Sequence, residues 1–324
     1  MSDLDLGEVL RLARRAYDSA VDAVLRGFAA GLPYELKPDG SPVTAMDVAT
    51  ERCIREVLLS GSDFGFIGEE TGVSGAGALC RWVVDPIDGT KSYIGGVPDF
   101  GVLIGFAMGE EFVAGLAGFP ALERVYTAAR GLGAWENGVA IASGDSDTAA
   151  FKGDSDPAAV SVKGNDDGDD SDAVIVNSDS EGAAVIARND DNNTGGGSND
   201  DGDDNGGGLT GIVSNPMRAE RDLGTGWKTL CDSATFLRVG GNCFGATLVA
   251  RGRMNFYLDA GLSVYDYAAL VPIVEQSGGV MTDWRGARLT LRADGSGSAD
   301  SVLAANTREH HAQILSWMGG TTDA

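Results

Sequence analysis

Apolar side chains recur at every third or fourth position along the first sixty residues. Between residues 8 and 29 they are Val9, Leu12, Ala13, Ala16, Ala20, Val24 and Phe28. This spacing places them on one face of an α-helix. The same spacing returns between Val48 and Leu59. The pattern therefore predicts two amphipathic helices at the start of the chain.

Shorter apolar runs follow, each bounded by turn residues. Residues 81–84 predict a buried strand that stops at Asp85-Pro86, because proline cannot donate a hydrogen bond to a neighbouring strand. Three further strand-like runs are separated by turns, as in an antiparallel meander. These runs are residues 101–108, 112–118 and 123–129. We expect residues 1–142 to form an α+β half.

The apolar pattern is lost between residues 143 and 208. Asp, Ser, Gly and Asn dominate there, with near-repeats at 165–170 and 199–205, and only 173–176 and 183–186 are apolar enough for strands. Such a composition buries too little apolar surface to offset the entropy of ordering the chain. We expect an acidic low-complexity insertion, most of it disordered.

Alternating apolar and polar runs resume at residue 209. Runs at 229–237, 243–250 and 254–258 are typical of helices and strands. A helix over 265–276, a strand over 302–305 and a last helix over 307–318 complete the pattern. We expect residues 209–324 to form an α/β half.

Charge narrows the possible functions. The 324 residues carry a net charge of −24, and residues 143–210 account for −14 of it, with 17 Asp and Glu against three Lys and Arg. The net charge therefore argues against nucleic-acid binding through a broad basic face. The acidic insertion is open to three interpretations: a solvated expansion, a segment for a basic partner, or adaptation to high salt.

The N-terminal residues and the cysteines indicate the cellular compartment and the kinds of site to expect. No apolar run of 18 residues occurs, and the N-terminal residues resemble no signal peptide, so we expect a cytoplasmic protein that does not enter membranes. The four cysteines contain no Cys-x-x-Cys pair, which argues against a zinc site and a disulfide framework.

The strongest indication of a functional site is the segment Asp85-Pro86-Ile87-Asp88-Gly89-Thr90. Two carboxylates three residues apart at a strand end can converge on one point, and hard divalent cations take oxygen ligands. Gly89 and Thr90 then offer close backbone approach and amide donors for a phosphate. Asp-x-x-Asp-Gly also occurs in ordinary turns, so the motif alone leaves both interpretations open.

Other acids stand in comparable places. Glu69 and Glu70 follow the apolar run 64–67 at another predicted strand end, where the alternative is a solvated acidic turn. Asp266 falls in the first turn of a strongly apolar helix, where the alternative is a helix cap.

Taken in order, these motifs resemble the inositol monophosphatase family of metal-dependent, lithium-sensitive phosphatases. The matching residues are Asp47, Gly68-Glu69-Glu70, residues 85–90, and Asp266 before Ala268-Ala269. The resemblance covers roughly residues 7–142 and 225–318. It implies a layered α-β-α-β-α fold and a homodimer that hydrolyses a small phosphate monoester.

The resemblance also implies a role for each residue, with two or three Mg²⁺ ions in the site. Glu69, Asp85 and the Ile87 carbonyl would hold one metal, and Asp85, Asp88 and Asp266 a second. Thr90 with Asp47, and Glu69 beside them, would activate the attacking water. The implied substrate contacts are Asp88, Gly89, Thr90 and Asp266 around the phosphate, Asn242 and Asp259 at the organic part, and Lys37 on a loop that closes over the site. For Lys37 the alternative is an exposed loop lysine.

Several stretches are most similar to the histidinol-phosphate phosphatase branch of the family. They are residues 85–93, 240–243, 259–262 and 265–284. This similarity implies hydrolysis of L-histidinol phosphate in histidine biosynthesis. The chain departs from the branch at Asn242, where an Asp is expected, and an acid interacts more strongly with the substrate's ammonium group than an amide does. Inositol 1-phosphate, another small sugar or nucleotide phosphate, and a non-catalytic binding role are the alternatives.

Overall fold

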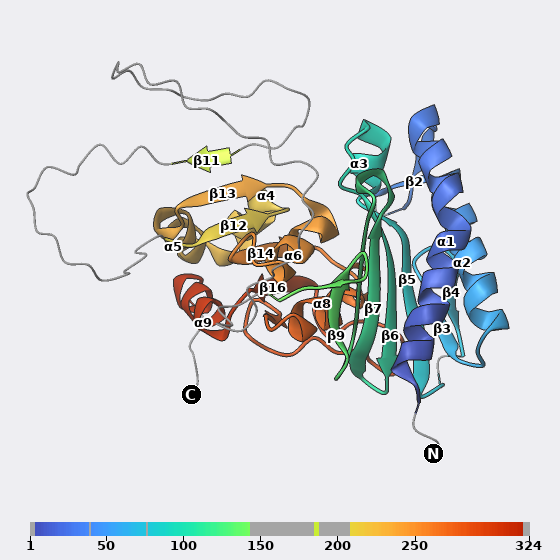
Figure 1. Ribbon diagram of the computed structural model, residues 1–324. Coiled ribbons are helices and arrows are strands. Elements are labelled where there is room, and N and C mark those ends of the chain that lie inside the picture. The colour runs from blue at the N-terminus through green and yellow to red at the C-terminus, as the bar shows by residue number, and fades with distance from the viewer. Residues whose placement is uncertain (1–3, 39, 76, 143–184, 188–207, 320–324) are drawn as a thin grey trace, which may run out of the picture. The chain divides into compact units, whose positions relative to one another are not determined.

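The computed structural model describes residues 4–38, 40–75, 77–142, 185–187 and 208–319. Helices and sheets alternate there in five layers, α-β-α-β-α (Figure 1). The predicted insertion at 143–208, including the strand expected at 173–176, lies outside the described residues except for β11 (Val185–Ala187) and Gly208.

The first layer consists of the two predicted helices, α1 (Leu6–Ala30) and α2 (Ala45–Ser60). Asp5 caps α1 by accepting hydrogen bonds from two backbone N–H groups, and Gly31 ends the helix at φ 63°. The apolar stripe of α1 is buried, as its spacing predicted. Both helices pack on one face of the first sheet.

The second layer is an eight-stranded sheet in the order β10-β9-β8-β7-β6-β5-β3-β4. Its strands are β3 (Gly65–Gly68), β4 (Gly72–Ser74), β5 (Cys80–Asp88), β6 (Gly101–Met108), β7 (Glu111–Phe119), β8 (Arg124–Ala129), β9 (Gly133–Glu136) and β10 (Val139–Ala140). Only β3 and β5 pair in parallel. The predicted meander is confirmed as β6, β7 and β8. A separate hairpin, β1 (Tyr34–Leu36) with β2 (Pro42–Thr44), precedes α2.

The end of β5 differs from the prediction, because the strand continues past Pro86 to Asp88. Its pairing with β6 is irregular between Asp85 and Asp88, so no ladder hydrogen bond is needed from Pro86. In a regular strand, residues three apart face opposite sides of the sheet. The irregularity lets both aspartates serve one site.

Helices α6 (Asn242–Ala250), α7 (Val264–Tyr267) and α8 (Leu270–Gln276) form the third layer, between the two sheets. The single helix predicted over 265–276 is wrong, since it is broken into α7 and α8. Pro272 explains the break, because it has no N–H to bond to Ala268 and its ring crowds that carbonyl. Ala268 and Ala269 fit against β6 and β7 because Gly105 and Gly115 have no side chain there.

The second sheet has the order β11-β13-β12-β14-β16-β15. Its remaining strands are β12 (Thr210–Val213), β13 (Phe236–Val239), β14 (Phe256–Ala260), β15 (Val280–Thr282) and β16 (Ser301–Ala305). Strands β13, β12 and β14 are parallel, which confirms the α/β second half. Helices α4 (Pro216–Leu223), α5 (Thr225–Ser233) and α9 (Arg308–Trp317) cover its outer face.

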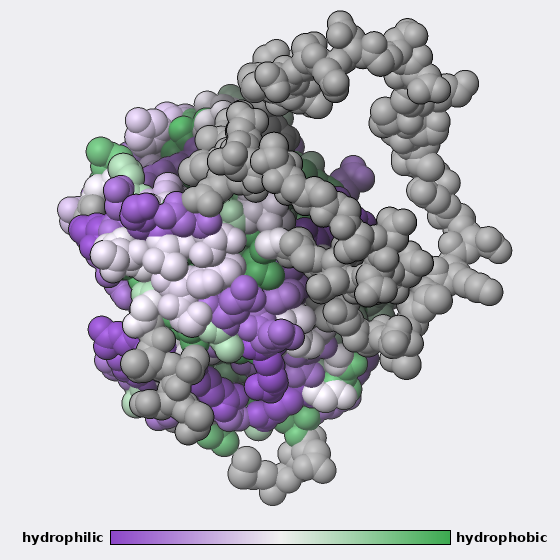
Figure 2. All heavy atoms as spheres, turned by 90° about the vertical axis from the view of Figure 1, so that its left-hand side faces the viewer, coloured by the Kyte–Doolittle hydropathy of each residue, from purple (hydrophilic) through white to green (hydrophobic). Residues whose placement is uncertain are grey.

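The surface on the side of α5 and α9 is mainly hydrophilic. Figure 2 shows the apolar side chains of its coloured residues in small separate groups. Such scattering is ordinary for a solvent-facing surface. Among the described helices, none has the length and apolar composition needed to cross a membrane.

Candidate active site

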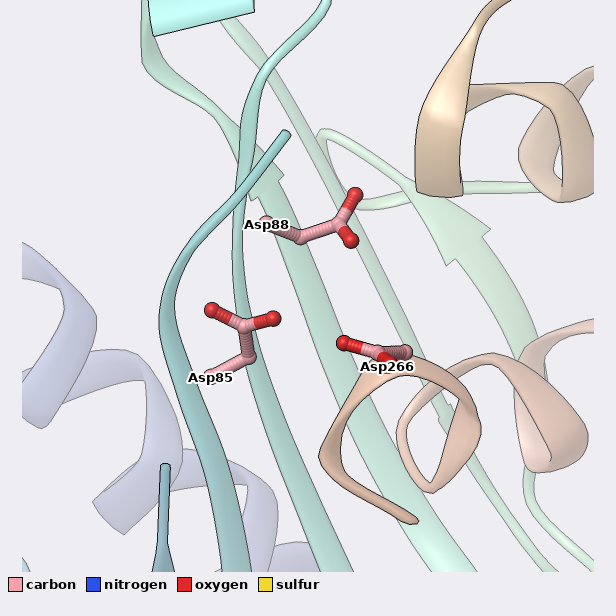
Figure 3. A group of neighbouring side chains, drawn as sticks. All are labelled: Asp85, Asp88 and Asp266. Atoms are coloured by element: carbon pink, nitrogen blue, oxygen red, sulfur yellow. The ribbon is translucent and has the colours of Figure 1, made fainter. Parts of the chain in front are cut away.

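Three aspartates from two distant segments of the chain converge beside the end of β5. Asp85 and Asp88 come from β5, and Asp266 comes from α7 in the middle layer. One carboxylate oxygen from each lies within 4.8 Å of the others, and Figure 3 shows the three groups around a common space. The structure thus brings these predicted ligands together.

Backbone N–H groups fix the orientation of each of these carboxylates. Ile87 N donates to Asp85 Oδ1 at 3.0 Å, and Cys243 N donates to Asp88 Oδ2 at 2.9 Å. Ser263 N donates to Asp266 Oδ2 at 2.6 Å, within a capping box at the start of α7. Each aspartate therefore has one oxygen fixed by a backbone N–H group.

Burial and mutual repulsion disfavour the anionic forms of the three aspartates. Burial raises the pKa of Asp85 well above its ordinary value, and the charges of Glu69, Asp88 and Asp266 raise it further. Burial raises the pKa of Asp88 to about 6. Burial and then the charge of Asp88 raise the pKa of Asp266. A bound cation would relieve this repulsion.

The donor set of this cluster fits Mg²⁺. All three side chains offer carboxylate oxygens, the ligands preferred by hard divalent cations, and Asp85 is only 2% exposed. Neither a thiolate nor an imidazole belongs to the group, so its chemistry does not favour zinc or copper.

Glu69 and Glu70 lie in the turn after β3, bound by Lys37. Lys37 Nζ donates to Glu69 Oε1 at 2.7 Å and to Glu70 Oε1 at 2.6 Å. Burial alone would lower the pKa of Lys37, but the two glutamates outweigh it and raise the value. Burial raises the pKa of Glu69 despite Lys37. Lys37 is thus paired with both glutamates, and its side chain is 21% exposed, which is unlike a solvent-exposed loop lysine.

Thr90 and Asp47 lie next to each other, where β5 turns into α3 (Thr90–Gly95). Thr90 Oγ1 is 3.4 Å from Asp47 Oδ1 and 3.2 Å from the Ile87 carbonyl oxygen. Asp47 Oδ2 accepts from Thr44 N at 2.8 Å and Thr44 Oγ1 at 2.6 Å. Gly89 makes the turn possible at φ 79°, a conformation that glycine adopts without strain.

Asp259 and Asn242 come from the second half of the chain. Asp259 accepts from Tyr257 OH at 2.9 Å and from Ala260 N at 2.7 Å, and burial raises its pKa to about 6. Asn242 Nδ2 donates to Ser92 Oγ at 2.9 Å and to Asp99 Oδ1 at 3.2 Å. The second sheet and α6 thus supply groups that neighbour the first-half motif.

Two acids of this region were not predicted. Glu51 is fully buried in α2, and its carboxylate accepts from Glu70 N at 2.7 Å and Thr71 N at 2.6 Å. The sequence could have indicated the burial of Glu51, because it lies four residues after Asp47 and three before Ile54, on one face of the helix. Asp99 stands alone between apolar residues in Val97-Pro98-Asp99-Phe100, which gave only a weak signal.

A family model described as the inositol monophosphatase family matches residues 5–180 and 206–318. A histidinol-phosphatase from Chlorobaculum parvum is 31% identical over 303 residues, which is 93% of this chain and 94% of that protein. A fructose-1,6-bisphosphatase/inositol-1-monophosphatase from Aquifex aeolicus is 39% identical over 120 residues, 37% of this chain and 46% of that protein.

Solved structures give the same result at the level of the fold. An inositol monophosphatase from Zymomonas mobilis superposes with a TM-score of 0.69 at 26% identity. The match covers 98% of this chain and 99% of that one. The layered architecture of the described residues is therefore shared with that structure.

Proposed function

The chain belongs to the inositol monophosphatase family, and from that premise we propose that it hydrolyses L-histidinol phosphate to L-histidinol and phosphate in histidine biosynthesis. Its relatives are named phosphatases, and the chain is a phosphoric monoester hydrolase. The convergence of Asp85, Asp88 and Asp266 carries the mechanistic part of the proposal.

In this proposal Asp85, Asp88, Asp266, Glu69 and the Ile87 carbonyl hold Mg²⁺. The chemistry supplied by Mg²⁺ is neutralisation of charge on the phosphoryl group and activation of a water molecule. Buried carboxylates that repel one another in the absence of a cation support this assignment. Lys37 neutralises Glu69 and Glu70 in the structure, and a bound cation would compete with it for Glu69.

Thr90 and Asp47 position the attacking water and receive its proton. The Thr90 hydroxyl has one hydrogen to donate, and when it donates to Asp47 its lone pairs are free to accept from water. Thr44 fixes Asp47 through two hydrogen bonds, so the acceptor is preorganised. Glu69 is a second proton acceptor in reach of the same water.

The other residues bind the substrate. The amides of Gly89 and Thr90 donate to the phosphate oxygens, while Asp88 and Asp266 border the phosphate. Asn242 and Asp259 face the organic part. These contacts hold the ester in one orientation relative to Thr90 and Asp47, which lowers the entropic part of the barrier.

The choice of histidinol phosphate is supported by similarity to the Chlorobaculum parvum protein over 93% of the chain. Inositol 1-phosphate is the second candidate. Asn242 in place of an acid favours it, as does the local similarity to the Aquifex aeolicus protein.

We propose three further properties of the protein. The chain has halves at 1–142 and 209–324 separated by the acidic insertion at 143–208, it forms a homodimer, and it works in the cytoplasm. Sedimentation equilibrium tests the second, with the mass of two chains expected and the mass of one chain contradicting it.

Phosphate release from histidinol phosphate and from inositol 1-phosphate, measured side by side with Mg²⁺, tests the substrate. We expect a higher kcat/KM for histidinol phosphate. A preference for inositol 1-phosphate would overturn the substrate assignment while keeping the phosphatase, and release from neither would contradict both candidates.

A further inference from the structure

Asn242 connects the substrate region to an acid that no motif identified. Its Nδ2 donates to Asp99 Oδ1 at 3.2 Å and to Ser92 Oγ at 2.9 Å. The same nitrogen would lie only 2.7 Å from a side chain added at Gly89, so the Asn242 amide packs on the turn proposed to hold the phosphate. Asp99 is therefore one hydrogen bond away from the substrate region.

Asp99 has no cationic partner in the part of the chain that the structure describes. Among the residues that the structure describes, no lysine, arginine or histidine forms an ion pair with it. Asp99 is half-buried on the loop between α3 and β6. It also lies outside the group of three aspartates that fits Mg²⁺. A metal at that group leaves the negative charge of Asp99 available to another cation.

The identities of residues 99 and 242 depend on each other. Asn242 can donate to a carboxylate, whereas an aspartate at position 242 would have no donor and would place a second negative charge about as close to Asp99 as Asn242 is now. Two carboxylates at hydrogen-bond distance cannot both stay ionised without a large penalty. An amide at position 242 and a carboxylate at position 99 thus keep one negative charge in this corner of the site.

We infer that Asp99 is a specificity-determining residue, and that its carboxylate, held by Asn242, receives the cationic amino group of an amino-alcohol phosphate. This inference rests on the proposed function, since it concerns the substrate's ammonium group. The family branch is expected to carry an acid at residue 242. Here residue 242 is an amide, and the negative charge is carried by Asp99 beside it. A neutral polyol phosphate gains nothing from that charge.

A charge-swap experiment tests the inference. Asp99→Asn, Asn242→Asp and the double variant Asp99→Asn/Asn242→Asp are compared with the wild type for histidinol phosphate and inositol 1-phosphate, with Mg²⁺ present. The readout is the ratio of the two kcat/KM values, with kcat and KM reported separately. Asp22→Asn is the matched control, because it removes the same charge from an exposed position on α1.

In Asp99→Asn we expect the ratio to fall by about tenfold or more, mainly through KM, as a lost charge-assisted hydrogen bond predicts. In the double variant the amide now at position 99 can donate to the carboxylate now at position 242, so the ratio should recover most of that loss. Asp22→Asn should keep the wild-type ratio. Inhibition by L-histidinol, which has no phosphate, should weaken in Asp99→Asn and recover in the double variant.

Equal losses for both substrates in Asp99→Asn would overturn the inference, since they would mean that Asp99 only orients Asn242. Failure of the double variant to recover, with its thermal unfolding unchanged, would also overturn it. If the wild type hydrolyses inositol 1-phosphate but not histidinol phosphate, the proposed substrate fails together with this inference. The wild-type assay therefore shows whether the proposed substrate is wrong, whereas the variants show whether the role of Asp99 alone is wrong.

Discussion

Lys37 and Glu69 form an ion pair, with Nζ and Oε1 2.7 Å apart, that joins the loop of the β1–β2 hairpin to the end of β3. The pair is shielded, since the two side chains are 21% and 18% exposed. Glu69 is also a proposed Mg²⁺ ligand, so in the proposal Lys37 and the metal compete for one carboxylate. The proposal therefore predicts that Lys37 stabilises the metal-free site and lowers its metal affinity.

Replacing Lys37 by Gln should therefore separate stability from metal binding. Without Lys37, Glu69 and Glu70 lose their cation, and we expect a loss of about 1–3 kcal/mol in the free energy of unfolding of the metal-free protein. Mg²⁺ should restore more stability to Lys37→Gln than to the wild type. Thermal unfolding in EDTA and in Mg²⁺ measures both effects.

Lys228→Gln is the control for this variant. Lys228 pairs with Asp232 at 2.9 Å on α5, but its side chain is 80% exposed, so we expect a change of less than about 0.5 kcal/mol. Equal destabilisation of the two variants in EDTA would show that the contacts of Lys37 with Glu69 and Glu70 contribute nothing special.

Glu51 provides a second prediction, since it holds the turn that carries Glu69. Glu51→Gln replaces one accepting oxygen by an NH₂ group, which leaves the N–H of Glu70 or Thr71 unpaired in a buried place. We expect a loss of about 1–3 kcal/mol in unfolding free energy and a higher Mg²⁺ concentration for half-maximal activity.

Glu56→Gln is the matched control, because Glu56 is exposed on the same helix. It should leave both the unfolding temperature and the Mg²⁺ requirement close to those of the wild type. A Glu51→Gln protein with wild-type values of both would refute the positioning role of Glu51.

The metal-free protein should become less stable as the pH rises from 5 to 7. The pKa of Asp259 is raised by burial from 3.8 to about 6 in the folded protein, so the folded state binds more protons than the unfolded state between these values. The stabilisation is complete below pH 3.8 and is lost as the pH rises through about 6. Unfolding temperatures in EDTA across this range measure the effect.

Asp259→Asn gives the test its control, because the amide has nearly the same shape and no titration in this range. The decrease in unfolding temperature between pH 5 and 7 should be smaller in this variant. An identical pH dependence in wild type and Asp259→Asn would assign the effect to other groups.

The sequence predicted most elements of the fold because their periodicities are simple. The stripe of α1 and the meander β6–β8 follow from local spacing alone. The break between α7 and α8 was not predicted, because the apolar pattern continues through Ala268 and Ala269. Pro272 was the residue that indicated it. Continuation of β5 beyond Pro86 depends on its irregular pairing with β6, which no local pattern encodes.

The site was predictable where residues form motifs and not where single residues meet across the fold. Asp85 and Asp88 belong to one motif, and resemblance to the family favoured a ligand role for Asp266 over a helix cap. Asp99 is a solitary acid whose partner, Asn242, lies 143 positions later in the chain. Its contact arises only when α6 packs beside the loop before β6.

The central claim is that Asp85, Asp88 and Asp266 form a Mg²⁺-dependent hydrolytic centre. Phosphate release from histidinol phosphate by the wild type and by Asp88→Asn, with Mg²⁺ and with EDTA, tests it most directly. The substitution removes one negative charge and almost no volume, so the fold should survive. Asp63→Asn, at an exposed position before β3, is the control.

We expect EDTA to stop release by the wild type and by Asp63→Asn. Asp88→Asn should lose more than about a hundredfold in rate with Mg²⁺ present, while its unfolding temperature in EDTA equals or exceeds that of the wild type. Near-normal Mg²⁺-dependent release by Asp88→Asn, or wild-type release that EDTA does not affect, would contradict the account.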